Sequence, residues 1–280
     1  MKWTLSLSSG IAYTRPLSDL LAPVRQAGFS RMQVTAAPGH FDYRNNERVL
    51  SLRREMDRLG IRTTSMHAPY GGKADLSSLH ESNRVAAVAE IERSADALVS
   101  LGGKVLVLHA GTEDEDARPQ WRIRLSQSRA SLARLYAYCR KLGLVLAVED
   151  MLAHLVGGRT EEVLWVMESL PREGAGICLD IGRSYLSGEL LHRVKQFGDR
   201  IVMVHAHDTM GVYDDHLPPG EGMVPWPSLL NRLADTGFDG EIVLEINDRP
   251  GAPDLIERAR KSALFLQRLA SAAGYSIDAG

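Results

Sequence analysis

Short apolar runs rich in Val, Leu and Ile alternate with longer amphipathic stretches along the whole chain. The apolar runs are predicted strands that start at Trp3, Met32, Ile61, Lys104, Leu144, Gly176, Ile201 and Glu241. Several are continuous Val, Leu and Ile runs, which are typical of parallel strands covered on both faces. The stretches between them have helical periodicity. In residues 81–101, apolar side chains recur every three or four residues, at Val85, Val88, Ile91, Ala95, Leu98 and Val99.

The ends of the predicted helices carry residues that favour a helix boundary. A Leu-Gly pair precedes three of the predicted strands, at Leu59-Gly60, Leu101-Gly102 and Leu142-Gly143. Glycine at this position permits the left-handed conformation that ends a helix. Pro225 and Pro227 flank Trp226, where the seventh helix is expected to begin, and proline is well tolerated there.

The repeated order of strand and helix predicts an α/β fold, a single (β/α)₈ TIM barrel over residues 1–280. The length of 280 residues is close to the roughly 250 of a typical barrel. A doubly wound open sheet is the alternative. That fold more often carries a glycine-rich phosphate-binding motif after its first strand, and none is present in this sequence.

Polar residues of the kind that bind metals stand at the ends of the predicted strands, from the third to the eighth. They are His67, His109, Glu149, Asp180, His205 and Glu245. In a barrel these positions converge on one rim, where catalytic groups lie. A carboxylate at the end of a buried strand is costly to desolvate unless it is paired or bound to a metal. Three carboxylates gathered there favour a divalent cation.

Each of these residues also has a structural explanation. Asp180 can cap the helix that follows it, and Glu149 and Glu245 can form structural ion pairs. His67 and His109 can be buried polar residues with ordinary hydrogen bonds. Because six consecutive predicted strands end in such residues, the six residues taken together favour a metal site.

Composition and charge narrow the function further. The formal net charge of −2 gives no basic excess for nucleic acid, so we expect no nucleic-acid partner. Cys139 and Cys178 are expected to be buried free thiols of a reducing compartment. The sequence has no signal-peptide pattern at its start and no apolar stretch long enough to span a bilayer. A cytoplasmic location without membrane association is therefore expected.

The segment VHAHDTMGVYDDHLPPGEGMVPW, followed by VLEIN around Glu245, is the most specific part of the sequence. With the polar strand ends, it makes the chain similar to the xylose isomerase-like TIM-barrel superfamily of sugar isomerases, epimerases and endonuclease IV enzymes. The similar segment of that superfamily carries a histidine, an Asp-x-His pair and a Gly-x-Gly turn. The corresponding residues here are His205, Asp214, His216, Gly220 and Gly222.

The resemblance to ketose 3-epimerases implies one divalent metal held by Glu149, Asp180, His205 and Glu245. Three carboxylates and one imidazole suit Mn²⁺ or Mg²⁺, although Zn²⁺ or Co²⁺ can compete on affinity. The resemblance also implies that His67 and His109 contact substrate. Arg183 can then meet a phosphate or carboxylate.

The resemblance to endonuclease IV implies instead a site of three zinc ions. Eight of its nine ligands have counterparts, which include His67, His109, Asp214 and His216, but the ninth position holds Arg183 in place of histidine. A guanidinium cannot bind a cation and repels one. Asp214 and His216 therefore remain open as second-metal ligands, as substrate contacts or as residues that fix their loop.

The function that we expect from this combination is a metal-dependent sugar isomerase or epimerase. It would remove a proton next to the carbonyl of a small carbohydrate, or of a sugar phosphate or polyol derivative, and form a metal-stabilised enediolate. Glu149 and Glu245 are the expected acid–base pair. An endonuclease IV-like phosphodiesterase, a related dehydratase or lyase, and a non-enzymatic binding barrel are the alternatives. A homo-oligomer is compatible with the sequence.

Overall fold

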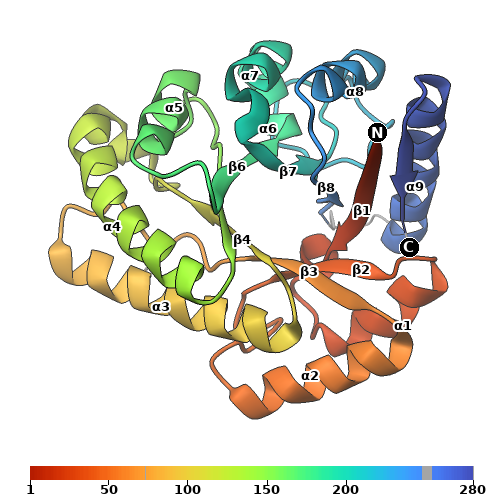
Figure 1. Ribbon diagram of the computed structural model, residues 1–280, viewed down its shortest axis with the longest axis horizontal. Coiled ribbons are helices and arrows are strands. Elements are labelled where there is room, and N and C mark those ends of the chain that lie inside the picture. Colours follow the sequence, from red (N-terminus) through yellow and green to blue (C-terminus); the bar gives the residue numbers. More distant parts are fainter. Residues whose placement is uncertain (73, 248–253, 280) are drawn as a thin grey trace.

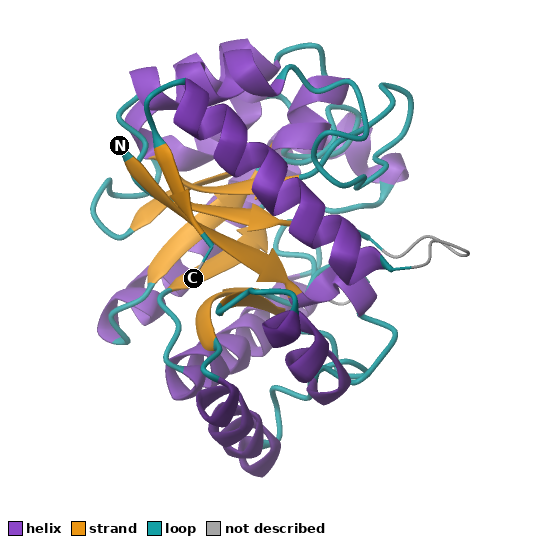
Figure 2. Ribbon diagram, turned by 90° about the vertical axis from the view of Figure 1, so that its right-hand side faces the viewer, coloured by secondary structure: helices purple, strands orange, loops and turns teal. Residues whose placement is uncertain are grey.

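The strands form a parallel sheet that is surrounded by the helices (Figures 1 and 2). The computed structural model describes residues 1–72, 74–247 and 254–279. Within these residues the strands are β1 (Lys2–Ser8), β2 (Arg31–Thr35), β3 (Arg62–His67), β4 (Val105–His109), β5 (Val145–Glu149), β6 (Ala175–Asp180), β7 (Ile201–Ala206), β8 (Glu241–Leu244) and β9 (Ser276–Asp278). The eight strands predicted from the sequence correspond to β1–β8.

The helices lie between successive strands. They are α1 (Ser18–Gln26), α2 (Asn46–Leu59), α3 (Glu81–Leu101), α4 (Trp121–Lys141), α5 (Thr160–Glu168), α6 (Ile181–Leu186), α7 (Leu190–Phe197), α8 (Trp226–Asp235) and α9 (Leu255–Ala272). Short 3₁₀ turns cover Ser9–Ala12, Glu115–Gln120 and Gly198–Arg200. The sixth strand is followed by two helices, α6 and α7, so the seventh helix of the sequence prediction is α8.

The sheet closes into a barrel because β1 pairs on both sides. Strands β2 to β8 follow one another in order, and β1 joins β8 through the pair Thr4–Glu241 and β2 through the pair Leu7–Met32. All of these pairings are parallel. The predicted (β/α)₈ TIM barrel is therefore confirmed, and the carboxyl ends of its strands share one rim. Strand β9, which the sequence did not predict, pairs with β1 through Lys2–Ser276.

The register of the parallel strands aligns their polar ends. His109 lies opposite Glu149 across β4 and β5, and Asp180 lies opposite His205 across β6 and β7. Below this level, the inside of the barrel is filled by Val107, Ala147, Cys178, Met203 and Val243. The polar side chains therefore stand on an apolar floor.

Most of the local sequence predictions are confirmed. Gly60 and Gly102 end α2 and α3 in the left-handed conformation, with φ of 68° and 83°. Helix α3 spans the predicted residues, but Val85 and Val99 face solvent, with exposed fractions of 50% and 41%. Cys139 and Cys178 are buried free thiols. No helix in the described residues is long and apolar enough to cross a membrane.

Candidate metal-binding active site

The six polar strand ends meet at one rim of the barrel. His67, His109, Glu149 and Asp180 are the last residues of β3, β4, β5 and β6, His205 is the last but one of β7, and Glu245 directly follows β8. Glu149, Asp180 and His205 are essentially inaccessible to solvent, and His67 and His109 are buried as well. Glu245 is partly exposed, with 15% of its side chain accessible. The structure therefore brings together all six residues that the sequence singled out.

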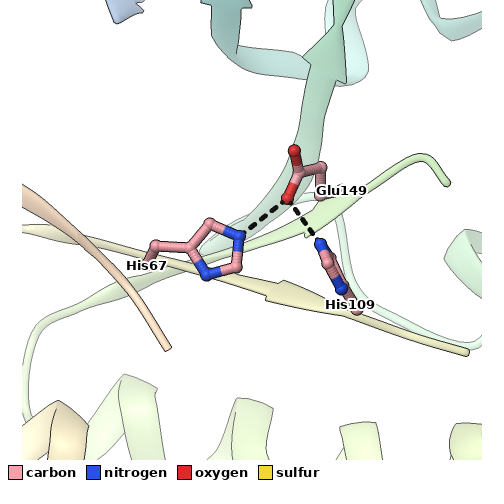
Figure 3. A group of neighbouring side chains, drawn as sticks. All are labelled: His67, His109 and Glu149. Atoms are coloured by element: carbon pink, nitrogen blue, oxygen red, sulfur yellow. Dashed lines mark hydrogen bonds and ion pairs between the residues drawn. The ribbon is translucent and has the colours of Figure 1, made fainter. Parts of the chain in front are cut away.

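Glu149 is the centre of this cluster. Its Oε2 lies 3.0 Å from Nε2 of His67 and 3.0 Å from Nε2 of His109 (Figure 3). Its Oε1 lies 2.9 Å from Nδ1 of His205 and 3.3 Å from Nη1 of Arg183. One buried carboxylate thus connects side chains from β3, β4, α6 and β7.

Glu149, Asp180, His205 and Glu245 have the arrangement of a cation site. Each offers one ligand atom, and the four atoms lie within 4.8 Å of one another. His205 Nδ1 lies between the two glutamates, 2.9 Å from Oε1 of Glu149 and 3.0 Å from Oε2 of Glu245. Asp180 Oδ2 and Glu245 Oε2 are buried and accept no hydrogen bond of regular geometry, although Nε of Arg183 lies 3.5 Å from the first and Nδ1 of His205 lies 3.0 Å from the second. A divalent cation would satisfy such buried carboxylate oxygens.

The two oxygens of Asp180 have separate surroundings. Its Oδ1 caps α6 by accepting the backbone N–H of Arg183 at 2.9 Å, and it also lies 2.9 Å from Nε2 of His207. Its Oδ2 makes no regular hydrogen bond and lies 3.5 Å from Nε of Arg183. The structural explanation of Asp180 as a helix cap is thus correct for one oxygen, while the other is available to a metal.

The charges of the cluster hold the two glutamates in their ionised form. Burial alone would raise the pKa of Glu149, but Arg183 and His205 hold that pKa well below its ordinary value. Burial would likewise raise the pKa of Glu245, and His205 lowers it. Burial opposes a charge on His205, yet Cys178 and the two glutamates raise its pKa well above the ordinary value. In the protein alone, the imidazolium of His205 is therefore the positive charge between the glutamates.

Arg183 points into the site. Its guanidinium lies 3.3 Å from Oε1 of Glu149, 3.5 Å from Oδ2 of Asp180 and 3.3 Å from Oδ2 of Asp214. Burial lowers the pKa of Arg183, but these three carboxylates raise it well above its ordinary value. Arg183 is thus a permanent cation whose partners are carboxylates of the protein, and its predicted contact with an anionic substrate group stays a prediction.

Asp214, His207 and His216 form a second group of ligand-type residues, which Arg183 contacts through Asp214. The rings of His207 and His216 stack with centroids 3.9 Å apart, and His216 Nε2 lies 3.4 Å from Oδ2 of Asp214. Burial lowers the pKa of His216, but Asp214 raises it to about 9. His216 has a left-handed backbone, with φ of 46°, which is uncommon outside glycine and is often found at functional sites.

The loop between β7 and α8 is fixed by Asp208. Its carboxylate accepts the backbone N–H groups of Gly220 and Val224, both at 2.9 Å, and the indole N–H of Trp226 at 2.8 Å. A Cβ on Gly222 would lie 2.4 Å from Oδ1 of Asp208, so glycine is required there. The Gly-x-Gly turn therefore has a structural role in this loop.

Three further features of the site were not predicted from the sequence. Tyr70 packs its ring edge-on against His67, with centroids 4.8 Å apart, and borders the opening of the site. Asp150 accepts the backbone N–H of Asp180 at the end of β6 and forms a fully buried ion pair with Arg193. Gln33, which lies inside the barrel, contacts His205. Gln33 is the only one that the strand pattern could have suggested, since it is a polar residue within an apolar strand.

Known proteins show similarity to large parts of the chain. An uncharacterized protein of Methanocaldococcus jannaschii, MJ1311, is 25% identical over 256 residues, which are 87% of this chain and 85% of the relative. A fructoselysine 3-epimerase of Escherichia coli O157:H7 is 26% identical over 119 residues, which are 41% of this chain and 43% of the relative. A probable endonuclease 4 of Mycobacterium leprae is 24% identical over 209 residues, which are 70% of this chain and 73% of the relative.

The solved structures give the same fold. The crystal structure of a D-tagatose 3-epimerase-like protein superposes with a TM-score of 0.84 at 22% identity and covers 96% of this chain and 98% of that one. Residues 21–269 match the family described as xylose isomerase-like TIM barrel. With the closed barrel and the polar rim of its strands, the chain belongs to the xylose isomerase-like TIM barrel family.

Proposed function

We propose that this protein is a metal-dependent isomerase or epimerase of a sugar or a sugar derivative. The observation that carries the proposal is the pair of glutamates on either side of His205. Glu149 and Glu245 come from β5 and β8, and both lie within 3.0 Å of Nδ1 of His205. The similarity to a fructoselysine 3-epimerase supports a carbohydrate substrate.

Glu149, Asp180, His205 and Glu245 would hold the divalent cation, for which Mn²⁺ or Mg²⁺ is favoured and Zn²⁺ or Co²⁺ is possible. When bound, the cation supplies the positive charge that stabilises an enediolate next to the substrate carbonyl.

The two glutamates move the proton. Because neighbouring positive charges lower their pKa values, Glu149 and Glu245 are ionised at neutral pH and can each accept a proton from carbon. If the glutamate that removes the proton also returns it to a neighbouring carbon, the result is an aldose–ketose shift. If the other glutamate takes up a proton from solvent and delivers it to the opposite side, the configuration of the carbon is inverted, and the first glutamate releases its proton to solvent.

The histidines and Tyr70 would form the wall that contacts the substrate. His67 and His109 both direct Nε2 at Glu149, and Tyr70 lies against both rings. Burial and the charges of Glu245 and Glu113 raise the pKa of Tyr70 to about 12, so its hydroxyl keeps its proton and can donate a hydrogen bond. Such neutral donors suit the hydroxyl groups of a sugar.

The proposal predicts exchange of a substrate proton with solvent. Wild-type protein loaded with Mn²⁺ should transfer deuterium from D₂O into an accepted ketose, at the carbon next to the carbonyl, when a panel of ketoses is followed by NMR. Glu149→Gln and Glu245→Gln should each lower the exchange or turnover by about 10²–10⁴-fold, because each removes one acid–base group.

The matched control is Glu115→Gln, which changes an exposed carboxylate on the same side of the barrel and should leave exchange unchanged. Metal content is measured in each variant, so that loss of the ion is separated from loss of the base. Undiminished turnover in both glutamate variants would reject the acid–base assignment.

A phosphodiesterase of endonuclease IV type is the second candidate. It is favoured by two further groups of ligand-type residues, His67 with His109 and Glu149, and His207 with Asp214 and His216. The similarity to a probable endonuclease 4 points the same way. Incubation with DNA that contains an abasic site separates the two functions, since only the nuclease cuts it.

A dehydratase or lyase would share the enediolate chemistry of the same site. Analysis of the product by mass separates it from an isomerase, because a dehydratase removes one water from the substrate. An isomerase or epimerase leaves the mass unchanged apart from the deuterium taken up from solvent.

A further inference from the structure

Gln33 lies directly beneath the candidate metal site. It is in β2, its side chain is completely buried inside the barrel, and its Nε2 lies 3.0 Å from Nε2 of His205. Its other neighbours are Oγ of Ser65 at 3.3 Å and Sδ of Met203 at 3.4 Å. The imidazole of His205 is thus held between Gln33 on one edge and Glu149 and Glu245 on the other.

The two nitrogens of His205 have different roles. Nδ1 faces the carboxylates of the site, so Nδ1 is the atom that can bind a cation. When its lone pair is used in this way, the proton of the neutral ring is on Nε2, which must then donate a hydrogen bond. Histidines that bind metals almost always donate their second N–H to an oxygen, which fixes the ring and strengthens the ligand.

The amide of Gln33 can supply that oxygen. As oriented in the structure, its Oε1 is buried without a hydrogen-bond partner, while its Nε2 faces the ring nitrogen. The oxygen and nitrogen of an amide differ only by a rotation of 180°, and their assignment follows the hydrogen-bond network. After this rotation, Oε1 takes the place 3.0 Å from Nε2 of His205 and accepts its N–H.

We propose that Gln33 is a positioning residue for the metal ligand His205, whose Nε2–H its amide oxygen accepts when Nδ1 binds the cation. The inference rests on the proposed function only in that His205 binds a metal. Gln33 acts through His205, and it is the side chain whose amide lies 3.0 Å from Nε2 of the ring, in a pocket that also contains Ser65, Met203 and Cys178.

The first test is the affinity of metal-free protein for Mn²⁺, measured by calorimetry without substrate. Gln33→Met has nearly the same shape but offers no oxygen, and we expect its dissociation constant to rise by about 10–100-fold. Gln33→Glu restores an acceptor, so it should bind at least as tightly as wild type. Met203→Leu changes the same pocket without removing the amide, and its affinity should stay unchanged.

A second test uses the wild-type protein, so it does not depend on the folding of a variant. In ¹⁵N NMR spectra of histidine-labelled protein, the signal of His205 is assigned by its absence in His205→Asn. Addition of Zn²⁺, which is diamagnetic, should give a metal-bound Nδ1 and a protonated Nε2. The side-chain amide signal of Gln33 should shift in the same titration.

The inference is overturned if Gln33→Met binds Mn²⁺ like wild type, if Met203→Leu loses as much affinity as Gln33→Met, or if Zn²⁺ binds Nε2. These outcomes differ from failure of the proposed function. If the wild type binds no divalent metal at all, the metal site itself is wrong. If metal binds as predicted but no sugar exchanges its protons, Gln33 keeps its role and only the reaction is wrong.

Discussion

At the scale of single residues, the guanidinium of Arg183 lies among three carboxylates, and we expect its charge to limit how many metal ions bind there. Arg183 lies within 3.3 to 3.5 Å of Glu149, Asp180 and Asp214. At an effective dielectric constant near 20, two unit charges about 4 Å apart interact by about 4 kcal/mol, and a dication doubles this repulsion. A metal next to Asp214 would have to overcome that cost with His207 and His216 as its only other ligand-type neighbours in the group, whereas the site of Glu149, Asp180, His205 and Glu245 offers four ligands, three of them carboxylates, against the same guanidinium.

Elemental analysis of metal-replete wild-type protein should therefore give one or two ions per chain. Arg183→His removes the positive charge and adds a nitrogen ligand near Asp214 and His216, so we expect one more ion per chain. Arg183→Met, which removes the charge without adding a ligand, is the control for simple loss of repulsion. Three tightly held zinc ions in the wild type, with cleavage of abasic DNA, would favour the nuclease.

At the scale of the elements, a buried ion pair joins the strand ends to the helices outside the barrel. Asp150, which follows β5, accepts the backbone N–H of Asp180 at 2.7 Å and the guanidinium of Arg193 at 2.7 Å. Arg193 belongs to α7 and is completely buried, and it also donates to the carbonyl of Gly158 at 2.6 Å. The ion pair therefore links β5, α7 and the end of β6 that carries Asp180.

Arg193→Met should destabilise the metal-free protein by about 3–5 kcal/mol at pH 8, because it leaves the charge of Asp150 buried and unpaired. Urea unfolding measures this loss. The exposed Arg232→Met, whose partner Asp235 lies 3.9 Å away, is the control and should change stability by less than about 1 kcal/mol.

The loss should also depend on pH. Burial raises the pKa of Asp150 to about 6, above the ordinary 3.8, although Arg193 lowers it. Because the pKa is higher in the folded protein, protonation of Asp150 adds to the free energy of unfolding. This stabilisation is fully present below pH 3.8 and is lost as the pH rises through 6. Without Arg193 the pKa rises further, so the difference from wild type should be smaller at pH 5 than at pH 8. An equal difference at both values would contradict this explanation.

The elements and the strand-end residues could be predicted because parallel topology alone brings the ends of strands to one rim. Glu149 and His205 follow from this rule without any knowledge of side-chain contacts. The roles of Gln33 and Arg193 do not follow from this rule. Gln33 meets His205 across 172 positions of the sequence, and only the closed barrel places them together. Arg193 lies on a helix, where an arginine is normally exposed, so its sequence context gives no reason to expect complete burial.

At the scale of the whole molecule, the candidate metal site connects four neighbouring strands, β5 to β8. The β1–β2 pairing consists of only two residue pairs, Leu7–Met32 and Ser8–Gln33, whereas β4 and β5 share five. A cation that binds the folded barrel and not the unfolded chain stabilises the whole closed sheet.

Addition of Mn²⁺ at about 100 times its dissociation constant should stabilise the protein by about 2.7 kcal/mol. For a chain of this size, this corresponds to a rise in Tm of roughly 4–6 °C, which calorimetry or dye fluorescence can measure. Asp180→Asn should lose most of the shift, because it weakens a ligand but keeps the helix cap. The Tm of the control Glu115→Gln should rise as much as that of wild type, because this variant leaves the four ligands intact.

The position of Arg183 also has an evolutionary consequence. An arginine codon of the form CGU or CGC becomes a histidine codon by one base change, and Arg183 lies beside Asp214, which forms a second group of ligand-type residues with His207 and His216. The rest of the rim need not change for the site to gain a further ligand. Selection could therefore move such a barrel between different numbers of bound ions in a single mutational step, while the fold and the remaining ligands are inherited unaltered.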